Sequence, residues 1–502
     1  MTKLHCIPLV AYLAVSLSFT LVSDASAQVA AGQTPPKSAP SLSFVPAKLP
    51  GPNGTMIEAE SGTLEVPANR STGAGAPFRL AVARLKSTTP NPTLPPLIYL
   101  ADGPGAPAIN TLREPERGAF LVKLRENRDV ILMDQRGTGR SKPMPGWLGP
   151  KRDRTGIFLS EANMIQFVRT VCAEAKVAFG EQHLDLAAFT TVENAADFRD
   201  LQLALGGQKI ALLGMSYGSH LGFAILRNFP EIVERAVFAG PVGPDELSKL
   251  PADYDAQFAR LTELAAHDPA ISAQVPNFAL LLRQVLVKLD REPLQITVLD
   301  QMEKQNVTIP LGRFGLQYIL RLDAADRSDF IHFPALVWEI SQGRTTLIQP
   351  LLQKRYNQML PGVAAMPMMM RLYSGASAAR RAQIKEQESK SLLGAAVNLP
   401  ELNLDDVWGN PDLGEQFRRP VETSVPVLFV SGSLDAISPP YRSAEAAKHA
   451  PHSVKLLVEN AGHEDLLTHP PAQALIEEYL RTGKLAQSRI TKEKPAFTAV
   501  PK

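Results

Sequence analysis

The chain has 502 residues, of which 45% are hydrophobic, so it is long enough for a large core and for more than one domain. Its 52 basic and 50 acidic residues are scattered without a basic stripe, which argues against a nucleic-acid or anionic-membrane partner and favours a neutral or modest-sized substrate. Only two cysteines are present and no Cys/His cluster exists. The sequence therefore predicts no metal, no cofactor and no disulfide scaffold.

The N-terminus has the pattern of an export signal. Lys3 precedes an apolar run over residues 7–22, and Ala25-Ser26-Ala27 follows as a small-residue cleavage site. A membrane anchor is the alternative, but the run is shorter than the roughly 20 apolar residues that a span needs. We therefore expect a signal peptide over residues 1–27 and a periplasmic or extracellular protein without a membrane partner after cleavage.

The segment that follows the signal is low in large apolar residues. Residues 28–55 are rich in Pro, Ala, Ser and Gly, which predicts a flexible leader, with the folded part beginning near Met56. Cleavage of the signal would remove Cys6 and leave Cys172 alone. A small buried apolar residue is the favoured role for Cys172, and a reactive thiol is the alternative.

Residues 56–240 alternate between strand and helix patterns. The first two strands have period-two alternation typical of an antiparallel pair, and the later ones are fully apolar, as in a parallel sheet covered on both faces. The expected strands are 62–66, 78–84, 97–100, 130–133, 210–213 and 236–239. The expected helices are 161–178 and 192–205, the second with Thr190 and Glu193 in capping-box spacing.

The alternation stops over residues 241–420, which carry long helical patterns and no clear strand series. Helices are expected over 277–289, 316–322 and 335–342. Met366, Met368, Met369 and Met370 lie in this segment, and core filling is favoured over an adaptable substrate wall. The alternation resumes over 421–484, with strands at 427–430 and 454–458 and a helix at 472–480; residues 485–502 are polar and expected to fray. The sequence thus predicts an α/β class with a mostly parallel sheet, helices on both faces and a helical cap insertion.

The stretch Lys209 to His220 contains a G-x-S-x-G pentapeptide between a strand pattern and a helix pattern. The glycines permit a tight turn, which raises the Ser216 hydroxyl onto a strand-to-helix corner over the positive end of the helix dipole. An oxyanion formed during acyl transfer would be stabilised there. The motif alone also marks ordinary turns, so a base and an acid must come from elsewhere.

Two later strand ends supply those residues. Asp435 lies in the loop after the strand that ends at Val430, and His463 lies in the loop after the strand that ends at Val458. Sites in open α/β sheets form outside the carboxyl ends of the strands, so Ser216, Asp435 and His463 are expected to converge. Ser216 would attack, His463 would carry the proton, and Asp435 would hold the imidazole tautomer.

His220 is the competing base, but it lies one helical turn beyond the serine, where its side chain is expected to pack or cap the helix. Tyr217 is expected to contribute a backbone N–H to the oxyanion hole. The second donor should be Gly103 or Asp102, in the loop after 97–100. The turn from Asp134 to Ser141, which contains Arg136, is interpreted as a structural neighbour of that loop.

These segments resemble the prolyl iminopeptidase and tripeptidyl aminopeptidase family of α/β-hydrolases, in particular its secreted tripeptidyl branch. The resemblance rests on DQRGTGRS at 134–141, GMSYG at 214–218, VPVLFVSGSLDAISP around Asp435, NAGH ending at His463, and the opening GTLEVP. It covers the sheet portions, with only general similarity in the insertion. It implies hydrolysis of short peptides from a free N-terminus, with cap carboxylates binding the α-ammonium group; Glu339 and Glu388 are candidates for that contact.

One position departs from the family pattern, which has Gly-Gly-Pro-Gly where this chain has Asp102-Gly103-Pro104-Gly105. A carboxylate there would weaken anion stabilisation if it points inward, or bind a substrate amine if it points at the pocket. A serine esterase of the same fold acting on small carboxylic esters is therefore the alternative function. A non-catalytic binding protein that retains the hydrolase shell is a third hypothesis. The sequence leaves the oligomeric state open.

Overall fold

The computed structural model describes residues 40–500. The signal peptide predicted for residues 1–27 and the first part of the predicted leader lie outside the described residues. Within residues 40–500, no helix combines the length and the apolar character that crossing a bilayer requires.

A ten-stranded sheet carries the fold, in the order β1-β2-β3-β5-β4-β7-β8-β12-β13-β14. The strands are β1 (Val45–Pro50), β2 (Met56–Val66), β3 (Phe78–Leu85), β4 (Leu97–Leu100), β5 (Val130–Met133), β7 (Ile210–Met215), β8 (Val233–Ala239), β12 (Val427–Gly432), β13 (Val454–Glu459) and β14 (Arg489–Thr491). The pairs from β1 to β5 along this order are antiparallel, and all later pairs are parallel. The predicted mostly parallel sheet is confirmed.

Alternating side chains of the central strands pack against helices on opposite faces of this sheet. Ile98 and Leu100 belong to the core formed with α2 (Glu161–Glu181), α3 (Thr191–Ala204) and α4 (Tyr217–Asn228). Leu97 and Tyr99 belong to the core formed with α1 (Pro115–Lys123) and α15 (Pro470–Thr482). Thr190 caps α3, because its side chain accepts a hydrogen bond from the backbone N–H of Glu193. The Glu193 carboxylate, which the predicted capping box would also use, accepts hydrogen bonds from Arg70.

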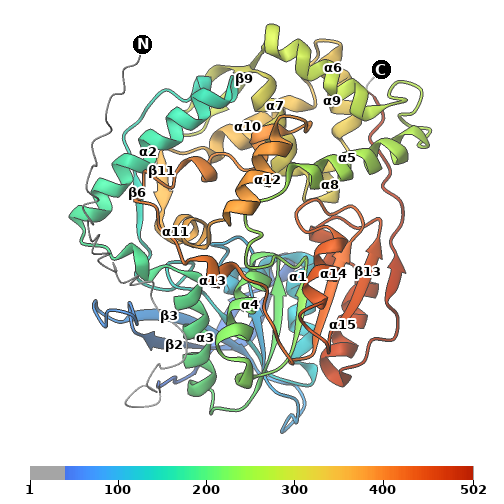
Figure 1. Ribbon diagram of the computed structural model, residues 1–502. Helices are drawn as coiled ribbons and strands as arrows, with labels where there is room; N and C mark the ends of the chain where they lie inside the picture. Colours follow the sequence, from blue (N-terminus) through green and yellow to red (C-terminus); the bar gives the residue numbers. More distant parts are fainter. Residues whose placement is uncertain (1–39, 501–502) are drawn as a thin grey trace, which may run out of the picture. The chain divides into compact units, whose positions relative to one another are not determined.

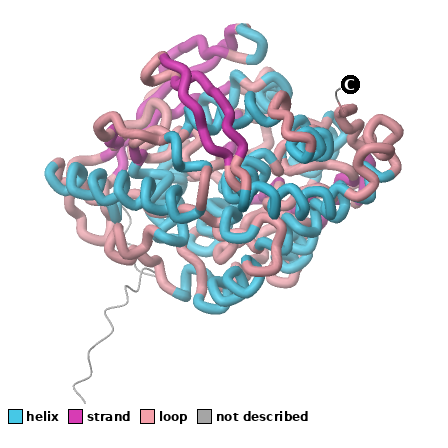
Figure 2. Tube along the Cα trace, turned by 90° about the horizontal axis from the view of Figure 1, so that it is seen from above, coloured by secondary structure: helices cyan, strands magenta, loops and turns pink. Residues whose placement is uncertain are grey.

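The segment 241–420 is a mainly helical insertion with a core of its own. In Figure 1 most of its helices lie above the parallel strands, and Figure 2 shows the molecule from above. They are α5 (Pro251–Ala266), α6 (Phe278–Arg291), α7 (Arg313–Asp323), α8 (Arg327–Phe330), α9 (Phe333–Ser341), α10 (Ile348–Gln358), α11 (Ala365–Ser374), α12 (Ala378–Glu388) and α13 (Glu415–Arg418). Short strands β6 (Gly146–Leu148) and β11 (Gly362–Ala364) pair beside them, and α14 (Pro440–Ala447) follows β12.

The insertion contains a hairpin that was not predicted from the sequence. Strands β9 (Leu294–Asp300) and β10 (Gln305–Leu311) form an antiparallel hairpin. Ile296 and Val298 are buried while their neighbours face outward, so the period-two pattern was present in the sequence. The methionines of α11 support the core-filling role, because Met366, Met369 and Met370 are buried in the core shared with α3 and α4.

Both ends of the described chain carry more structure than the sequence predicts. Strand β1 lies inside the predicted leader 28–55; it is an edge strand, where its two prolines are tolerated, and Leu49 is buried. Strand β14 lies inside the tail 485–502, which was expected to fray, and pairs with β13. Phe497 is buried against the core of the insertion, and this burial fixes the tail.

Candidate active site

Ser216 occupies a strained turn between β7 and α4. Its backbone has φ 51° and ψ −117°, a region that residues with a side chain rarely adopt. The turn is possible because its flanking glycines have no side chain: a Cβ on Gly218 would lie 2.0 Å from the carbonyl oxygen of Leu100, and one on Gly214 would lie 2.8 Å from the backbone of Gly218. Ser219 fixes the turn further, because its hydroxyl donates to the carbonyl of Ser216 at 2.5 Å.

His463 and Asp435 meet in a buried hydrogen bond. Nδ1 of His463 lies 2.7 Å from Oδ2 of Asp435, and the side chains are 3% and 0% exposed. The other carboxylate oxygen of Asp435 accepts the backbone N–H groups of Ile437 and Ser438, at 2.7 and 2.9 Å. These bonds fix the carboxylate, which in turn fixes the ring plane of the imidazole.

The surroundings of His463 make it a stronger base than an ordinary histidine. Burial lowers its pKa, but the charge and hydrogen bond of Asp435 outweigh burial and leave the pKa above the ordinary value of 6.5. Its Nε2 atom is buried and has no hydrogen-bond partner among the described residues. A buried ring nitrogen without a hydrogen-bond partner is available to accept a proton from a reacting group.

Ser216 and His463 both lie close to the backbone at the end of β8. The N–H of Ser216 donates to the carbonyl of Ala239 at 2.9 Å. A Cβ on the next residue, Gly240, would lie 2.5 Å from Cε1 of His463. The three predicted residues therefore follow the carboxyl ends of β7, β12 and β13 in one sheet. Asp435 and His463 are hydrogen-bonded, whereas Nε2 of His463 has no partner among the described residues.

The predicted oxyanion donors border the serine turn. Strand β4 pairs with β7 so that Leu100 lies beside Gly214, and the chain then turns at Gly103, whose φ is +112°. Tyr217 is the first residue of α4, so its N–H belongs to the first turn, which has no acceptor within the helix. The side-chain hydroxyl of Tyr217 donates to Met370 Sδ at 2.9 Å, which connects this position to α11.

The carboxylate of Asp102 is already paired. Arg117, on α1, places Nη1 3.0 Å from Oδ2 of Asp102 and Nη2 2.5 Å from Oε2 of Glu464, the residue after His463. Arg117 was not identified from the sequence, because the residues around it have the pattern of an ordinary short amphipathic helix.

The competing histidine is engaged elsewhere. Nδ1 of His220 lies 3.0 Å from the carbonyl oxygen of Gly243, and Nε2 lies 3.2 Å from the hydroxyl of Ser374. Burial lowers the pKa of His220 to about 4. Neither nitrogen is directed at Ser216, so the interpretation of His220 as a packing residue agrees with its contacts.

The two acids considered for the substrate amine lie elsewhere in the insertion. Glu339 is buried in α9, where its Oε2 accepts the backbone N–H of Leu347 at 2.8 Å. Glu388 is the last residue of α12. Among the described residues, Glu339 contacts the backbone of Leu347 and Glu388 interacts with Glu161 and Lys385, none of which belongs to the candidate triad.

The remaining predicted residues have structural contacts. Cys172 is buried, and burial raises the pKa of its thiol to about 11. Arg136 is fully buried and bonds both carboxylate oxygens of Asp197 at 2.7 Å. Asp134 accepts backbone N–H groups from Ile109 and Arg140. Within residues 40–500, no group of three His, Cys, Asp or Glu residues gathers as a metal site would require.

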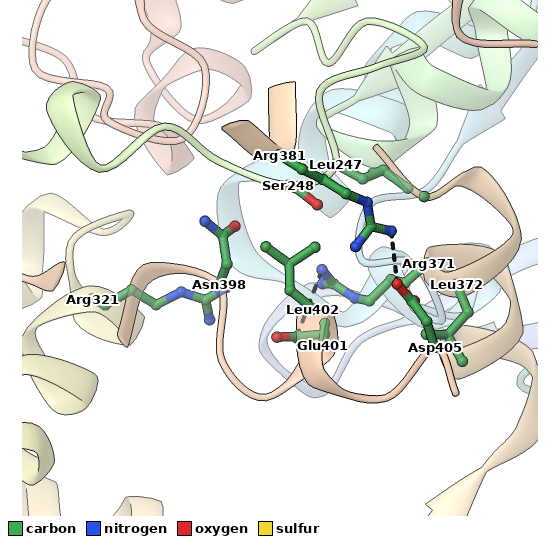
Figure 3. Close-up of a pocket in the computed structure, with 11 residues that line it drawn as sticks. Leu247, Ser248, Arg321, Arg371, Leu372, Arg381, Asn398, Glu401, Leu402 and Asp405 are labelled. Atoms are coloured by element: carbon green, nitrogen blue, oxygen red, sulfur yellow. Dashed lines mark ion pairs between the residues drawn. The ribbon is translucent and has the colours of Figure 1, made fainter. Parts of the chain in front are cut away.

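A pocket within the insertion is lined by charged side chains of both signs (Figure 3). Arg381 pairs with Asp405 at 2.8 Å, while Arg371 lies 3.9 Å from Glu401. The Oε2 atom of Glu401 is buried and has no hydrogen-bond partner in the described part of the chain. Arg321 completes the charged lining.

The loop after β8 contributes residues both to the pocket and to the surroundings of the candidate triad. Ser248 lines the pocket, and the next residue, Lys249, interacts electrostatically with Asp435 and His463. Asn398, which also lines the pocket, bonds the backbone N–H and carbonyl of Lys249, both at 2.7 Å. Burial, with the charge of Arg442 nearby, lowers the pKa of Lys249 to about 7.

Comparison with known proteins identifies relatives of this fold. Residues 104–470 match the family model described as alpha/beta hydrolase fold. The chain is 30% identical to a tripeptidyl aminopeptidase of Streptomyces lividans over 193 residues, 37% of this chain and 36% of that protein. It is 28% identical to the serine protease Hip1 of Mycobacterium bovis over 214 residues, 39% of this chain and 38% of that protein.

A solved structure of a proline iminopeptidase from Mycobacterium smegmatis is similar at 14% identity with a TM-score of 0.39, covering 84% of this chain and 97% of that one. The matches to the two curated relatives thus span less than two fifths of their lengths.

Proposed function

The chain belongs to the alpha/beta hydrolase fold family, and on that premise we propose that it is a serine hydrolase that cleaves short peptides from a free N-terminus. The observation that carries the proposal is the buried Asp435–His463 hydrogen bond at the strand end next to the strained Ser216 turn. The names of the relatives, a tripeptidyl aminopeptidase and a serine protease, support the class and the peptide substrate.

The proposed reaction proceeds in two halves. The hydroxyl oxygen of Ser216 attacks the scissile carbonyl carbon while Nε2 of His463 takes the proton, and the oxyanion is held by the N–H groups of Tyr217 and Gly103. The intermediate collapses as the imidazolium returns the proton to the leaving amine, which leaves an acyl-enzyme. Water then attacks the acyl carbon by the same route and releases the carboxylic acid and the free serine.

Glu401 is the carboxylate that we propose for the substrate α-ammonium group. It lines the charged pocket, and one of its oxygens is buried without a hydrogen-bond partner among residues 40–500. Glu339 also has one such oxygen, but it does not line this pocket, and its other oxygen accepts the backbone N–H of Leu347. An ammonium group would supply the missing donors. Ser248 lines the pocket, and the next residue, Lys249, interacts electrostatically with Asp435. We therefore propose that a short peptide extends from Glu401 toward Ser216.

A substrate panel tests the reaction and its direction. Purified protein is assayed with aminoacyl and tripeptidyl arylamides, with the same compounds blocked at the amine, and with short acyl esters. We expect cleavage of the free-amine peptides and a loss of about 10⁴-fold or more in kcat for Ser216→Ala. Equal cleavage of blocked peptides would contradict the exopeptidase proposal, and esters turned over far faster than any peptide would favour an esterase.

A matched pair of variants tests the role of Glu401. Glu401→Gln is expected to raise KM for free-amine peptides by about tenfold and to leave blocked substrates unaffected, because a charge-assisted hydrogen bond of roughly 1.5 kcal/mol or more is lost. Glu386→Gln is the control, since Glu386 is an exposed acid that pairs with Lys390. The same KM for both variants would remove Glu401 from the proposal.

We also propose that the protein is exported and that residues 1–27 are removed. The support is the A-x-A pattern before Gln28. Expression of the full chain, followed by fractionation and N-terminal sequencing, should find a protein that begins at Gln28 in the periplasm or medium. A product that retains Met1 and stays in the cytoplasm would contradict export.

A further inference from the structure

One buried guanidinium joins the loops on the two sides of the candidate site. Arg117 contacts Asp102 at 3.0 Å with Nη1 and Glu464 at 2.5 Å with Nη2, and its Nε lies 3.3 Å from Glu114. Its side chain is 6% exposed, whereas the side chains of Asp102 and Glu464 are 25% and 37% exposed. The buried Arg117 side chain therefore binds two partly exposed carboxylates, and we call this arrangement the bridge.

Asp102 and Glu464 are each adjacent in sequence to a residue of the proposed catalytic site. Asp102 immediately precedes Gly103, the proposed second oxyanion donor, and the pairing of Leu100 with Gly214 places this loop beside the serine turn. Glu464 immediately follows His463, the proposed base. A single side chain on α1 thus connects the proposed oxyanion loop to the loop that carries the imidazole.

The bridge also balances charge. A bare carboxylate at Asp102 would oppose the negative charge that develops on the substrate oxygen in the transition state. Burial lowers the pKa of Arg117, but Tyr99, Asp102, Glu464 and Glu114 together raise it above its ordinary value, so the guanidinium remains protonated. The positive charge therefore persists at any pH at which the site works.

We propose that Arg117 is a positioning residue for hydrolysis, which neutralises Asp102 and fixes the oxyanion loop relative to His463. This role rests on the proposed function of Ser216 and His463. Asp102 is accordingly a partner of Arg117 and neither binds the substrate amine nor destabilises the oxyanion, because its charge is already compensated. Arg117 acts through these two loops and does not touch the reacting atoms.

A double-mutant cycle tests the proposal, with kcat and KM measured separately. Arg117→Met is expected to lower kcat by about 10- to 100-fold with little change in KM, because Asp102 is left uncompensated beside the oxyanion. Asp102→Asn alone should stay within a few-fold of the parent. The double variant Arg117→Met/Asp102→Asn should recover most of the lost kcat, since the opposing charge is gone. A purely structural role for Arg117 predicts no such recovery.

Control variants distinguish loss of the Arg117 bridge from loss of folding and from failure of the proposed reaction. Arg169→Met removes an exposed arginine that pairs with Asp406 and should leave kcat unchanged. If Arg117→Met does not fold, as judged by its thermal transition, Arg117→Gln replaces it in both arms of the cycle. Unchanged kcat in the folded Arg117 variant, or no recovery in the double variant, overturns the inference. Turnover that survives Ser216→Ala overturns the proposed function instead.

Discussion

Nδ1 of His463 lies 2.7 Å from Oδ2 of Asp435, with both side chains almost completely buried. An ionised carboxylate only accepts hydrogen bonds, so Nδ1 carries the hydrogen and Nε2 is left free to accept a proton. The pair fixes the tautomer that a general base at Nε2 requires. This relationship joins two loops that are separated by a whole strand and helix in the sequence.

The pH dependence of activity should follow from this pair. The imidazole must be neutral to accept the proton of Ser216, and its pKa is raised above 6.5 by Asp435 despite burial. We therefore expect kcat/KM to rise with pH through a midpoint above 6.5. In Asp435→Asn the midpoint should move to lower pH, and kcat should fall by about 10⁴-fold because the tautomer is no longer fixed. A pH–rate profile of each protein checks this. A midpoint that does not move in Asp435→Asn would contradict the assignment of the rise in kcat/KM to His463.

The serine turn should not tolerate a side chain at Gly218. A methyl group there would lie 2.0 Å from the carbonyl oxygen of Leu100, at the end of a central strand that cannot move without disturbing the sheet. Gly218→Ala is expected to lower the free energy of unfolding by about 2–4 kcal/mol and to abolish labelling of Ser216 by a fluorophosphonate. Thermal unfolding and labelling provide the measurements.

Gly180→Ala is the matched control for that substitution. Gly180 lies in α2, and a Cβ added there meets nothing within 4 Å. Because alanine favours the helix by roughly 0.5–1 kcal/mol, this variant should be equally or more stable and should be labelled at the parent rate. Equal stabilities for the two alanine variants would show that the close approach at Gly218 does not constrain the turn.

Much of the fold and the candidate triad could be predicted because both depend on short local patterns. Apolar runs predicted the central strands, and Ser216, Asp435 and His463 each lie a few residues beyond such a run. The hairpin β9–β10 was missed although its alternation is visible at Ile296 and Val298, because the helical patterns around it dominated the interpretation.

The contacts that tune the site could not be predicted, because they depend on residues distant in the sequence. Arg117 bonds Asp102 from 15 positions away and Glu464 from 347 positions away. Lys249 acquires its lowered pKa only when the insertion buries it against Arg442. No periodicity or motif records such pairings, which arise only when segments distant in the sequence pack together.

His220 and His463 should respond differently to the same substitution. Both ring nitrogens of His220 are engaged, with Gly243 and Ser374, and burial holds its pKa at about 4. His220→Gln is expected to lower the melting temperature but to keep fluorophosphonate labelling of Ser216, because it removes no base. His463→Gln should lose labelling by at least about 10³-fold while remaining folded. Retained labelling in His463→Gln, or its loss in folded His220→Gln, would reverse the two assignments.

Lys249 should couple the stability of the protein to pH. Burial lowers its pKa from 10.5 to about 7, so between these values the unfolded chain binds a proton that the folded protein does not. Stability is therefore lost as pH falls from about 10 toward 7. Lys249→Met removes this cost and is expected to raise the melting temperature at pH 7 by several degrees, with a smaller gain at pH 10.

The same variant should also shift the activity profile. The charge of Lys249 lowers the pKa of His463, so its removal should move the acidic midpoint of kcat/KM to higher pH. Lys448→Met is the control, because Lys448 is exposed and pairs with Glu445 at 2.7 Å. Melting curves at pH 7 and 10, together with pH–rate profiles, provide the comparison. A gain in melting temperature that is the same at both pH values would contradict the lowered pKa of Lys249. A midpoint that stays in place or moves to lower pH would show that Lys249 does not exert its charge on His463.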